Sequence, residues 1–192
     1  MKLTKNLIIS TLLLVVSANI PAMALDNIPD GWNKAGSKPA EYEVGTDKIS
    51  GKKIMYILGK TNNIDDFGTV MQTFNANKYL GKRLKLSALL KSQNVNEAGM
   101  WMRVDGEKKS SLSFDNMQNR PIKGTTNWKK YDIVLDVPKE STAIIFGVLT
   151  SGKGKVWIKD ISFQEVPTSV KTTDLNSIKN MKDVPANLDF EN

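Results

Sequence analysis

The sequence of 192 residues contains no cysteine and no histidine. Without cysteine the chain can form no disulfide bond and can carry no lipid anchor attached through a cysteine, so its core must hold it together. Without histidine it has no Ser–His or Cys–His catalytic group and no imidazole base, and nearly every kind of zinc site is excluded. These two absences remove large classes of enzymes.

Long runs of one charge are also missing. The formal net charge is +7, from 27 basic and 20 acidic residues that are scattered along the chain. Because no basic run could follow a phosphate backbone, we expect no nucleic-acid partner. Turn and strand-end oxygens could hold a structural calcium ion, but no Asp-rich loop marks such a site, so no cofactor is expected.

The first 24 residues have the features of a secretory signal peptide. Lys2 and Lys5 precede the apolar stretch from Leu7 to Ile20, and Ala22-Met23-Ala24 then supplies a small-x-small cleavage signal. An uncleaved anchor is the alternative, which the shortness of the apolar stretch disfavours. We therefore expect a secreted or periplasmic protein, cut after residue 24, with no membrane attachment afterwards.

The rest of the chain predicts short strands. Leu84, Leu86, Ala88 and Leu90 share one face, with Arg83, Lys85 and Ser87 on the other, as in a strand with one buried face. The region from Ala143 to Leu149 is apolar on both faces and should be a central strand. Short strands separated by turns predict an all-β fold with two packed antiparallel sheets. The expected strands are 53–58, 67–74, 83–91, 98–104, 131–136, 143–149 and 156–163, with a polar turn at 93–97.

The C-terminal part changes character. Residues 25–166 form the predicted domain, and the polar residues 167–186 read as a linker or tail. The stretch 187–192, Asn-Leu-Asp-Phe-Glu-Asn, alternates apolar and polar side chains, which predicts a strand docked on the sandwich with one buried face. A frayed terminus is the alternative.

Several stretches between residues 30 and 166 together resemble a known domain family. In chain order they are Gly31-Trp32, Gly36–Pro39, Tyr42-Glu43, Phe67–Gln72, Tyr79–Ala88, Ala98–Gly106, Phe114–Gln118, Trp128–Tyr131 and Val156–Ile161. They are similar in type and order to a bacterial jelly-roll domain of the galactose-binding-like, carbohydrate-binding-module type. The resemblance implies a jelly-roll sandwich and a carbohydrate or another small polar ligand, in a domain that occurs alone in exported proteins and beside other domains, including those of transcriptional regulators.

The sequence departs from this pattern at one point. Jelly rolls of this type often have a strand like N-x-D-F-E just before the Gly-Trp pair. Here that motif lies at 187–191 instead. Either a following domain was lost, or the C-terminal strand takes the place of the first one.

Trp101 and Arg103 are the first candidate ligand residues. In a strand they share one face, opposite Met100 and Met102. A tryptophan ring can lie against a sugar ring, and arginine offers a rigid fork of donors to hydroxyls. The alternative is a structural cation–π pair. An exposed Trp101 in a groove would favour binding, and a buried one would favour a structural role.

The next polar stretch holds the other candidates: Phe114, Asn116, Gln118 and Arg120. Its amide and guanidinium groups suit the reading of hydroxyls, and it should form the strand edge and loop beside Trp101. A structural loop with capped turns is the alternative.

The function expected from these observations is that of a non-catalytic binding module. Glycoside hydrolysis needs two facing carboxyl groups, whereas Asp105 and Glu107 sit at a turn, where carboxylates are usually solvated. The alternatives are a structural or protein-interaction sandwich and, third, a glycoside hydrolase-like enzyme. The sequence identifies neither the ligand nor the oligomeric state.

Overall fold

The computed structural model describes residues 28–175, apart from the side chain of Lys109. The predicted signal peptide at 1–24 and the predicted C-terminal strand at 187–192 lie outside these residues, as does the predicted linker from 176 onward. None of the helices within 28–175 has the length and apolar character needed to cross a membrane.

The described residues form nine strands joined by loops and short 3₁₀ helices, as the sequence predicted for an all-β protein. Every strand pairing is antiparallel. The elements are β1 (Asn33–Gly36), η1 (Pro39–Glu41), β2 (Tyr42–Ile49), β3 (Lys52–Gly59), β4 (Phe67–Asn75), η2 (Ala76–Tyr79), β5 (Lys82–Asp105), η3 (Glu107–Lys109), β6 (Ser111–Asp115), β7 (Ile122–Val137), β8 (Ala143–Ser151) and β9 (Gly154–Val166).

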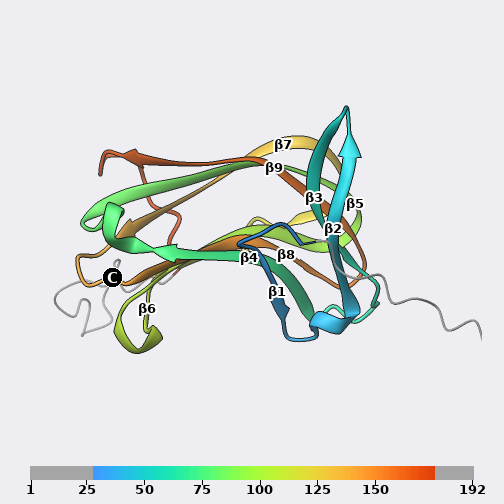
Figure 1. Ribbon diagram of the computed structural model, residues 1–192, viewed down its shortest axis with the longest axis horizontal. Coiled ribbons are helices and arrows are strands. Elements are labelled where there is room, and N and C mark those ends of the chain that lie inside the picture. Colours follow the sequence, from blue (N-terminus) through green and yellow to red (C-terminus); the bar gives the residue numbers. More distant parts are fainter. Residues whose placement is uncertain (1–27, 176–192) are drawn as a thin grey trace, which may run out of the picture.

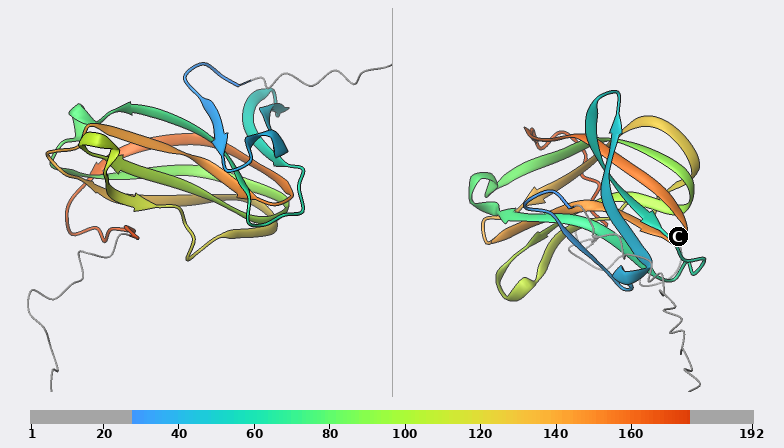
Figure 2. Two further views of the ribbon diagram at one scale, coloured as in Figure 1. Left: turned by 90° about the horizontal axis from the view of Figure 1, so that it is seen from below. Right: turned by 45° about the vertical axis from the view of Figure 1, so that its right-hand side comes forward.

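Two layers face each other, with β7 and β9 in one and β4 and β8 in the other (Figure 1). The long strand β5 belongs to both layers: its first part pairs with β7 and β9, and its second part pairs with β6 and β8. The two predicted sheets are therefore joined through β5 into one curled, hydrogen-bonded sheet. The β2–β3 hairpin stands at one end of the sandwich (Figure 1 and the left view of Figure 2).

The predicted polar turn at 93–97 is wrong, because these residues continue β5. Ser92, Val95 and Ala98 each pair with β7, with a register shift between each of them and the next. Asn94 takes a positive φ of 52°, a conformation that asparagine tolerates better than most residues. The irregular pairing bends the strand, so β5 passes from one layer to the other without a loop.

The core lies between the layers and follows the predicted alternation. Leu84, Leu86 and Leu90 from the first part of β5 are fully buried, as are Met100 and Met102 from its second part. Each large side chain removed from water in this way contributes about 1.5–3 kcal/mol to folding. The residues that alternate with these point away from the core, and those of the second part define the candidate site.

The described beginning of the predicted linker is bound to the sandwich. The backbone nitrogen of Thr173 donates to the Val134 carbonyl oxygen on β7 at 2.8 Å, and the nitrogen of Leu175 donates to the Phe114 carbonyl oxygen on β6 at 2.7 Å. Residues 173–175 therefore form a clasp that joins the edge strand of one layer to the edge strand of the other.

Candidate functional site: a groove on the outer face of β4, β8, β5 and β6

The candidate site begins with the alternation of β5. Met100 and Met102 point into the core with no exposed surface, so Trp101 and Arg103 face outward, as the sequence predicted. Gly147 of β8 lies directly opposite Trp101, and Phe114 of β6 lies opposite Arg103. Residues from four neighbouring strands therefore share this outer face.

Trp101 is packed flush with this face. Its indole Nε1 donates to Oγ1 of Thr69 on β4 at 2.8 Å, and that hydroxyl donates to the Val148 carbonyl oxygen at 2.9 Å. To reach Thr69 the indole must extend across β8, at the level where Gly147 has no side chain. Only 8% of the residue is exposed. By the criterion set from the sequence, this burial favours a structural role for the ring, although the ring also lines the hollows described next.

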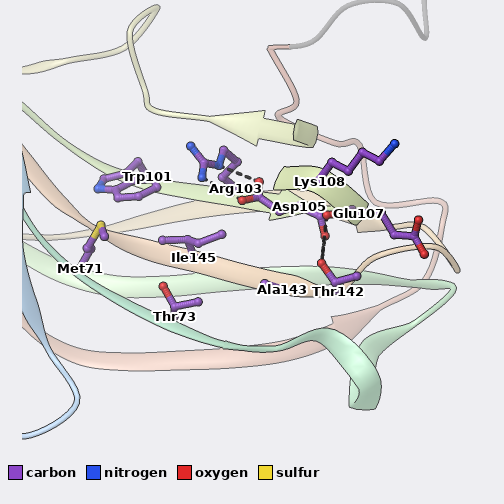
Figure 3. Close-up of a pocket in the computed structure, with 11 residues that line it drawn as sticks. Met71, Thr73, Trp101, Arg103, Asp105, Glu107, Lys108, Thr142, Ala143 and Ile145 are labelled. Atoms are coloured by element: carbon purple, nitrogen blue, oxygen red, sulfur yellow. Dashed lines mark hydrogen bonds and ion pairs between the residues drawn. The ribbon is translucent and has the colours of Figure 1, made fainter. Parts of the chain in front are cut away.

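One hollow on this face has a volume of about 820 Å³ (Figure 3). Its apolar lining includes Trp101, Met71 and Ile145, from three adjacent strands. At the far end the chain turns away through η3, where Glu107 and Lys108 add charged groups. The hollow thus has an apolar floor and a charged end.

Two smaller hollows continue the first one. The second, of about 290 Å³, shares Trp101 and Arg103 with the first and adds Phe67 and Phe114. The third, of about 120 Å³, shares Asn116 with the second and extends to Gln118 and Glu97. From Asp105 to Glu97 the groove follows β5 over nine residues, roughly 26 Å for the eight steps of about 3.3 Å between them.

An ion pair fixes the middle of the groove. Arg103 donates from Nε and one terminal nitrogen to the two carboxylate oxygens of Asp105, at 2.7 and 2.8 Å (Figure 3). The backbone of Asp105 is held in turn by Thr142, whose nitrogen donates to its carbonyl oxygen at 2.7 Å. The guanidinium is therefore fixed in a bidentate pair, and it keeps further N–H groups for a ligand.

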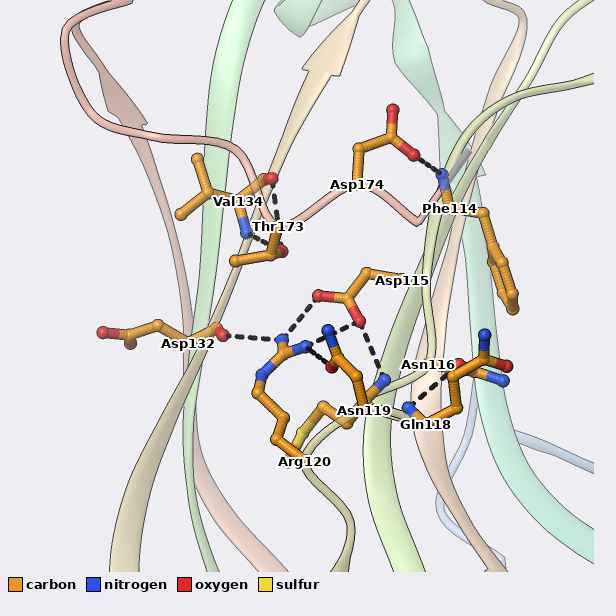
Figure 4. Close-up of polar contacts among 11 residues, drawn as sticks. Phe114, Asp115, Asn116, Gln118, Asn119, Arg120, Asp132, Val134, Thr173 and Asp174 are labelled. Atoms are coloured by element: carbon orange, nitrogen blue, oxygen red, sulfur yellow. Dashed lines mark hydrogen bonds and ion pairs between the residues drawn. The ribbon is translucent and has the colours of Figure 1, made fainter. Parts of the chain in front are cut away.

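Arg120, the last of the predicted site residues, is engaged elsewhere. Its guanidinium forms a pair with Asp115, whose side chain is fully buried, and donates to the Asn119 side chain. In Figure 4 it lies on the opposite side of β6 from the Phe114 ring. The structure thus gathers the other five predicted residues along the groove, whereas Arg120 is absent from the lining of the three hollows. Its position is that of a residue that supports the loop holding Asn116 and Gln118.

Sequence reasoning missed the groove residues of β4 and β8. Phe67, Met71, Ile145 and Leu149 all line the hollows. The available signal was the apolar character of β8 on both faces, from which the sequence predicted only a central strand. In the structure one face of β8 packs on the core and the other forms the floor of an open groove.

No metal centre accompanies the groove in the described part of the chain. Between residues 28 and 175 no three acidic, histidine or cysteine side chains come together as a metal site would require. The arrangement offers an elongated apolar floor with planar polar side chains beside it.

Comparison with known proteins gives a fold and one near relative in sequence. No family model matches the chain. The chain is 47% identical, over 166 residues, to the uncharacterized HTH-type transcriptional regulator YbfP of Bacillus subtilis (strain 168); the match covers 84% of this chain and 56% of the regulator. The chain therefore spans about half the length of that relative.

Solved structures with similar folds include carbohydrate-binding modules. The C-terminal family 22 module of Clostridium thermocellum Xyn10B superposes with a TM-score of 0.51 at 12% identity, over 74% of this chain and 89% of the module. The chain has the galactose-binding-like jelly-roll fold. Larger proteins contain it too: the CBM22-1–GH10 modules of Clostridium thermocellum xylanase 10B (TM-score 0.50, 14% identity) and a bacteriophage CBA120 tailspike domain (0.52, 12%). The match covers 71% of this chain in both, but only 26% and 20% of those chains.

Proposed function

We propose that the protein is an exported, non-catalytic binding module whose groove takes a carbohydrate chain. The observation that carries this proposal is the continuous groove along β5, in which Trp101 and Phe67 line an apolar surface and Arg103 and Asn116 stand beside it. A sugar chain presents apolar ring faces and hydroxyl edges, and this lining matches both. A groove of roughly 26 Å, along nine strand residues, suits several linked sugars better than a single one.

The fold supports the choice of ligand class. The solved xylanase 10B modules, which contain a jelly roll of this fold, were crystallised with xylohexaose. At 14% identity that likeness concerns the fold alone, so the proposal for this chain depends on its own groove. Another small polar ligand with an apolar face would satisfy the same lining.

The carboxylates of the groove support a non-catalytic role. Hydrolysis of a glycosidic bond uses one carboxyl group as an acid and a second one as a base or nucleophile. Asp105 is held in a bidentate pair by Arg103, which leaves it poorly placed for either task. Glu107 is exposed at the end of the groove.

The similarity to a transcriptional regulator is compatible with the proposal of a non-catalytic binding module. A helix-turn-helix motif needs two α-helices, and residues 28–175 contain strands and 3₁₀ helices only. The described part of the match is therefore a jelly roll rather than the DNA-reading element of the relative. Recognition of a small ligand by a jelly roll suits both an exported module and a module beside another domain.

Binding is tested with a glycan array on the protein beginning at Leu25, followed by affinity measurements on any glycan found. The variant Asn116→Ala should weaken binding at least several-fold, because it removes an amide from the middle of the groove. The matched control Asn62→Ala changes an exposed asparagine outside the groove lining and should leave binding unchanged. Equal loss in both variants, or no glycan bound by the unaltered protein, contradicts the proposal.

Export is tested separately. N-terminal sequencing of protein recovered outside the cytoplasm should begin Leu25-Asp26-Asn27, because the small-x-small signal ends at Ala24. A chain that still begins at Met1 in the membrane fraction contradicts cleavage.

A second candidate function is a structural or protein-interaction sandwich. The observation in its favour is the packing of Trp101, which is 8% exposed and hydrogen-bonded to Thr69. Under this alternative the groove serves to order the face of the sheet, and no glycan on the array binds.

A further inference from the structure

One edge of the sandwich is only half covered. β9 pairs with β5 along most of its length on one side, but on its other side only Gly154 to Ile158 pair with β3. Past Ile158, no strand within residues 28–175 pairs with this side of β9. An unpaired edge leaves backbone donors and acceptors free and is a place where another strand can add.

A bulge and a hairpin together open this edge. Between Ser87 and Leu89 of β5 the pairing with β9 shifts register, and Asp160 takes a positive φ of 53°. A bulge of this kind bends the strand. Residues 52–54 of β3, on the side of the hairpin tip, do not pair with β9. There the β2–β3 hairpin rises steeply while β9 runs on in another direction (Figure 1).

The fork between the hairpin and β9 contains a cavity of about 470 Å³. Its apolar lining includes Met55, Ile158 and two residues that are only partly buried, Trp32 and Ile161. Lys52 and Lys53, both exposed, stand at its rim. Lys159 and the exposed Asp160 also line it. The half-covered edge therefore lies beside an apolar cavity whose charged lining is three lysines and one aspartate.

We propose that this edge takes an added β-strand, and that the strand is the segment 187–191 of the same chain, Asn-Leu-Asp-Phe-Glu. In a strand Leu188 and Phe190 share one face, and Asp189 and Glu191 share the other. With the apolar pair turned inward, over Ile161 and the cavity, the acidic pair faces outward into solvent. Strand addition of this kind draws its affinity from backbone hydrogen bonds and its selectivity from alternate side chains.

The length of the intervening chain allows this docking. The last described residue, Leu175, is anchored to Phe114 of β6, and eleven residues, 176–186, separate it from the segment. Fully extended, those residues span roughly 36–40 Å. A domain the size of the described part has a radius of gyration of only about 15 Å, so the segment can reach the open edge.

Cysteine pairs test the contact directly, because the chain has no cysteine of its own. Asp189→Cys is combined with Ser162→Cys or with Gln164→Cys, both exposed positions on β9. The matched control combines Asp189→Cys with Asn127→Cys, an exposed position on β7, which lies on the other side of β5. Under mild oxidation at low protein concentration, at least one β9 pair should form a disulfide within a single chain, well above the control.

The opposing outcomes are distinct. Disulfide-linked dimers show that the occupant of the edge comes from a second copy, and they overturn the assignment. Equal crosslinking of the control pair, or none from either β9 pair, also overturns it. As a second measurement, Phe190→Ala should lower the melting temperature whereas Asn187→Ala should not; equal melting temperatures for the two variants contradict burial of Phe190.

Discussion

The outer faces of the two layers use the same residue types in opposite ways. On the β4–β8 layer, Trp101 lines an open groove, and the neighbouring arginine bonds to Asp105 rather than to the ring. On the β7–β9 layer the rings are covered by lysines: the Lys155 ammonium lies 3.5 Å from the Tyr56 ring centre and 5.0 Å from that of Trp157. A cation beside an aromatic ring therefore says little about binding until its other partners are known.

The covered face is also tied together by acids. Asp47 accepts from the Trp157 Nε1 and from Lys155, both at 2.7 Å. Glu43 accepts from the Tyr56 hydroxyl at 2.7 Å and pairs with Lys60. The lysine side chains cover the faces of the rings. These hydrogen bonds pair the indole N–H and the phenol O–H with groups of the protein itself. The cation–π pair considered as the alternative for Trp101 is thus realised on the opposite layer.

The largest expected effect compares the two tryptophans. Trp101→Ala and Trp157→Ala should each lower the free energy of unfolding by about 3–5 kcal/mol, because each ring is buried. Chemical denaturation measures both. Only Trp101→Ala should also abolish glycan binding, measured under conditions where both variants remain folded. A loss below about 1 kcal/mol for Trp101→Ala would show that its ring is not part of the packing.

A smaller effect is expected from the hydroxyl that orients Trp101. Thr69→Val keeps the shape of the side chain but leaves the indole N–H without its acceptor, which costs about 1–3 kcal/mol. Denaturation measures the loss, and weaker glycan binding should accompany it if the ring orientation matters. The control Thr73→Val changes a threonine that also lines the groove but contacts no indole nitrogen, and it should have little effect on stability.

The acids of the covered face predict a dependence on pH. Hydrogen bonds from Lys60 and Tyr56 lower the pKa of Glu43. Burial raises the pKa of Asp47, but the hydrogen bonds from Lys155 and Trp157 outweigh this and lower it overall. Because both pKa values are lower when folded, the stability they contribute is present above the unfolded values, near 4, and is lost as pH falls through the folded values.

Unfolding midpoints at pH 7 and pH 3 check this prediction. Glu43→Gln with Asp47→Asn should reduce the loss of stability between the two pH values relative to the unaltered protein. The same loss in both proteins would place the acid sensitivity elsewhere.

The smallest effect is expected from a lysine that covers a ring. Lys91 lies 5.4 Å from the centre of the Trp157 ring and forms no ion pair with a described residue. Lys91→Gln should change stability by no more than about 0.5–1 kcal/mol, the range of an exposed cation–π contact. Denaturation measures this change, and glycan binding should stay the same, since Lys91 is on the layer opposite the groove. Weakened binding of a glycan would move the site to the covered face.

Much of the fold could be predicted because periodicity is a local property. The alternation around Leu84 and Met100 placed core and outer faces correctly, and the apolar run of β8 correctly indicated a central strand. The polar residues at 93–97 were misread as a turn, because a bulged strand and a loop share the same asparagine-rich composition. The edge strands β1 and β2 went unpredicted.

The candidate site was predicted in part for the same reason. Phe114 and Asn116 follow the strand beside Trp101, so adjacency in the sequence brought them to the groove. Phe67 and Ile145 come from strands far apart in the chain, and only the pairing of β4 with β8 and β8 with β5 sets them beside Trp101. Arg120 was grouped with the site by sequence proximity, although a buried carboxylate holds it on the other side of β6.

The sequence by itself determined the all-β class, the faces of most strands and the absence of cysteine and histidine chemistry, since these depend on residue type and alternation along one strand. Only the tertiary structure decided which aromatic rings stand in a groove and which lie beneath lysines. That choice depends on partners from distant strands: Thr69 and Gly147 for Trp101, and Asp47 for Trp157. The physical reason is that hydrogen-bond partners and free space at a face are set by strand order and register, which no single stretch of the chain encodes.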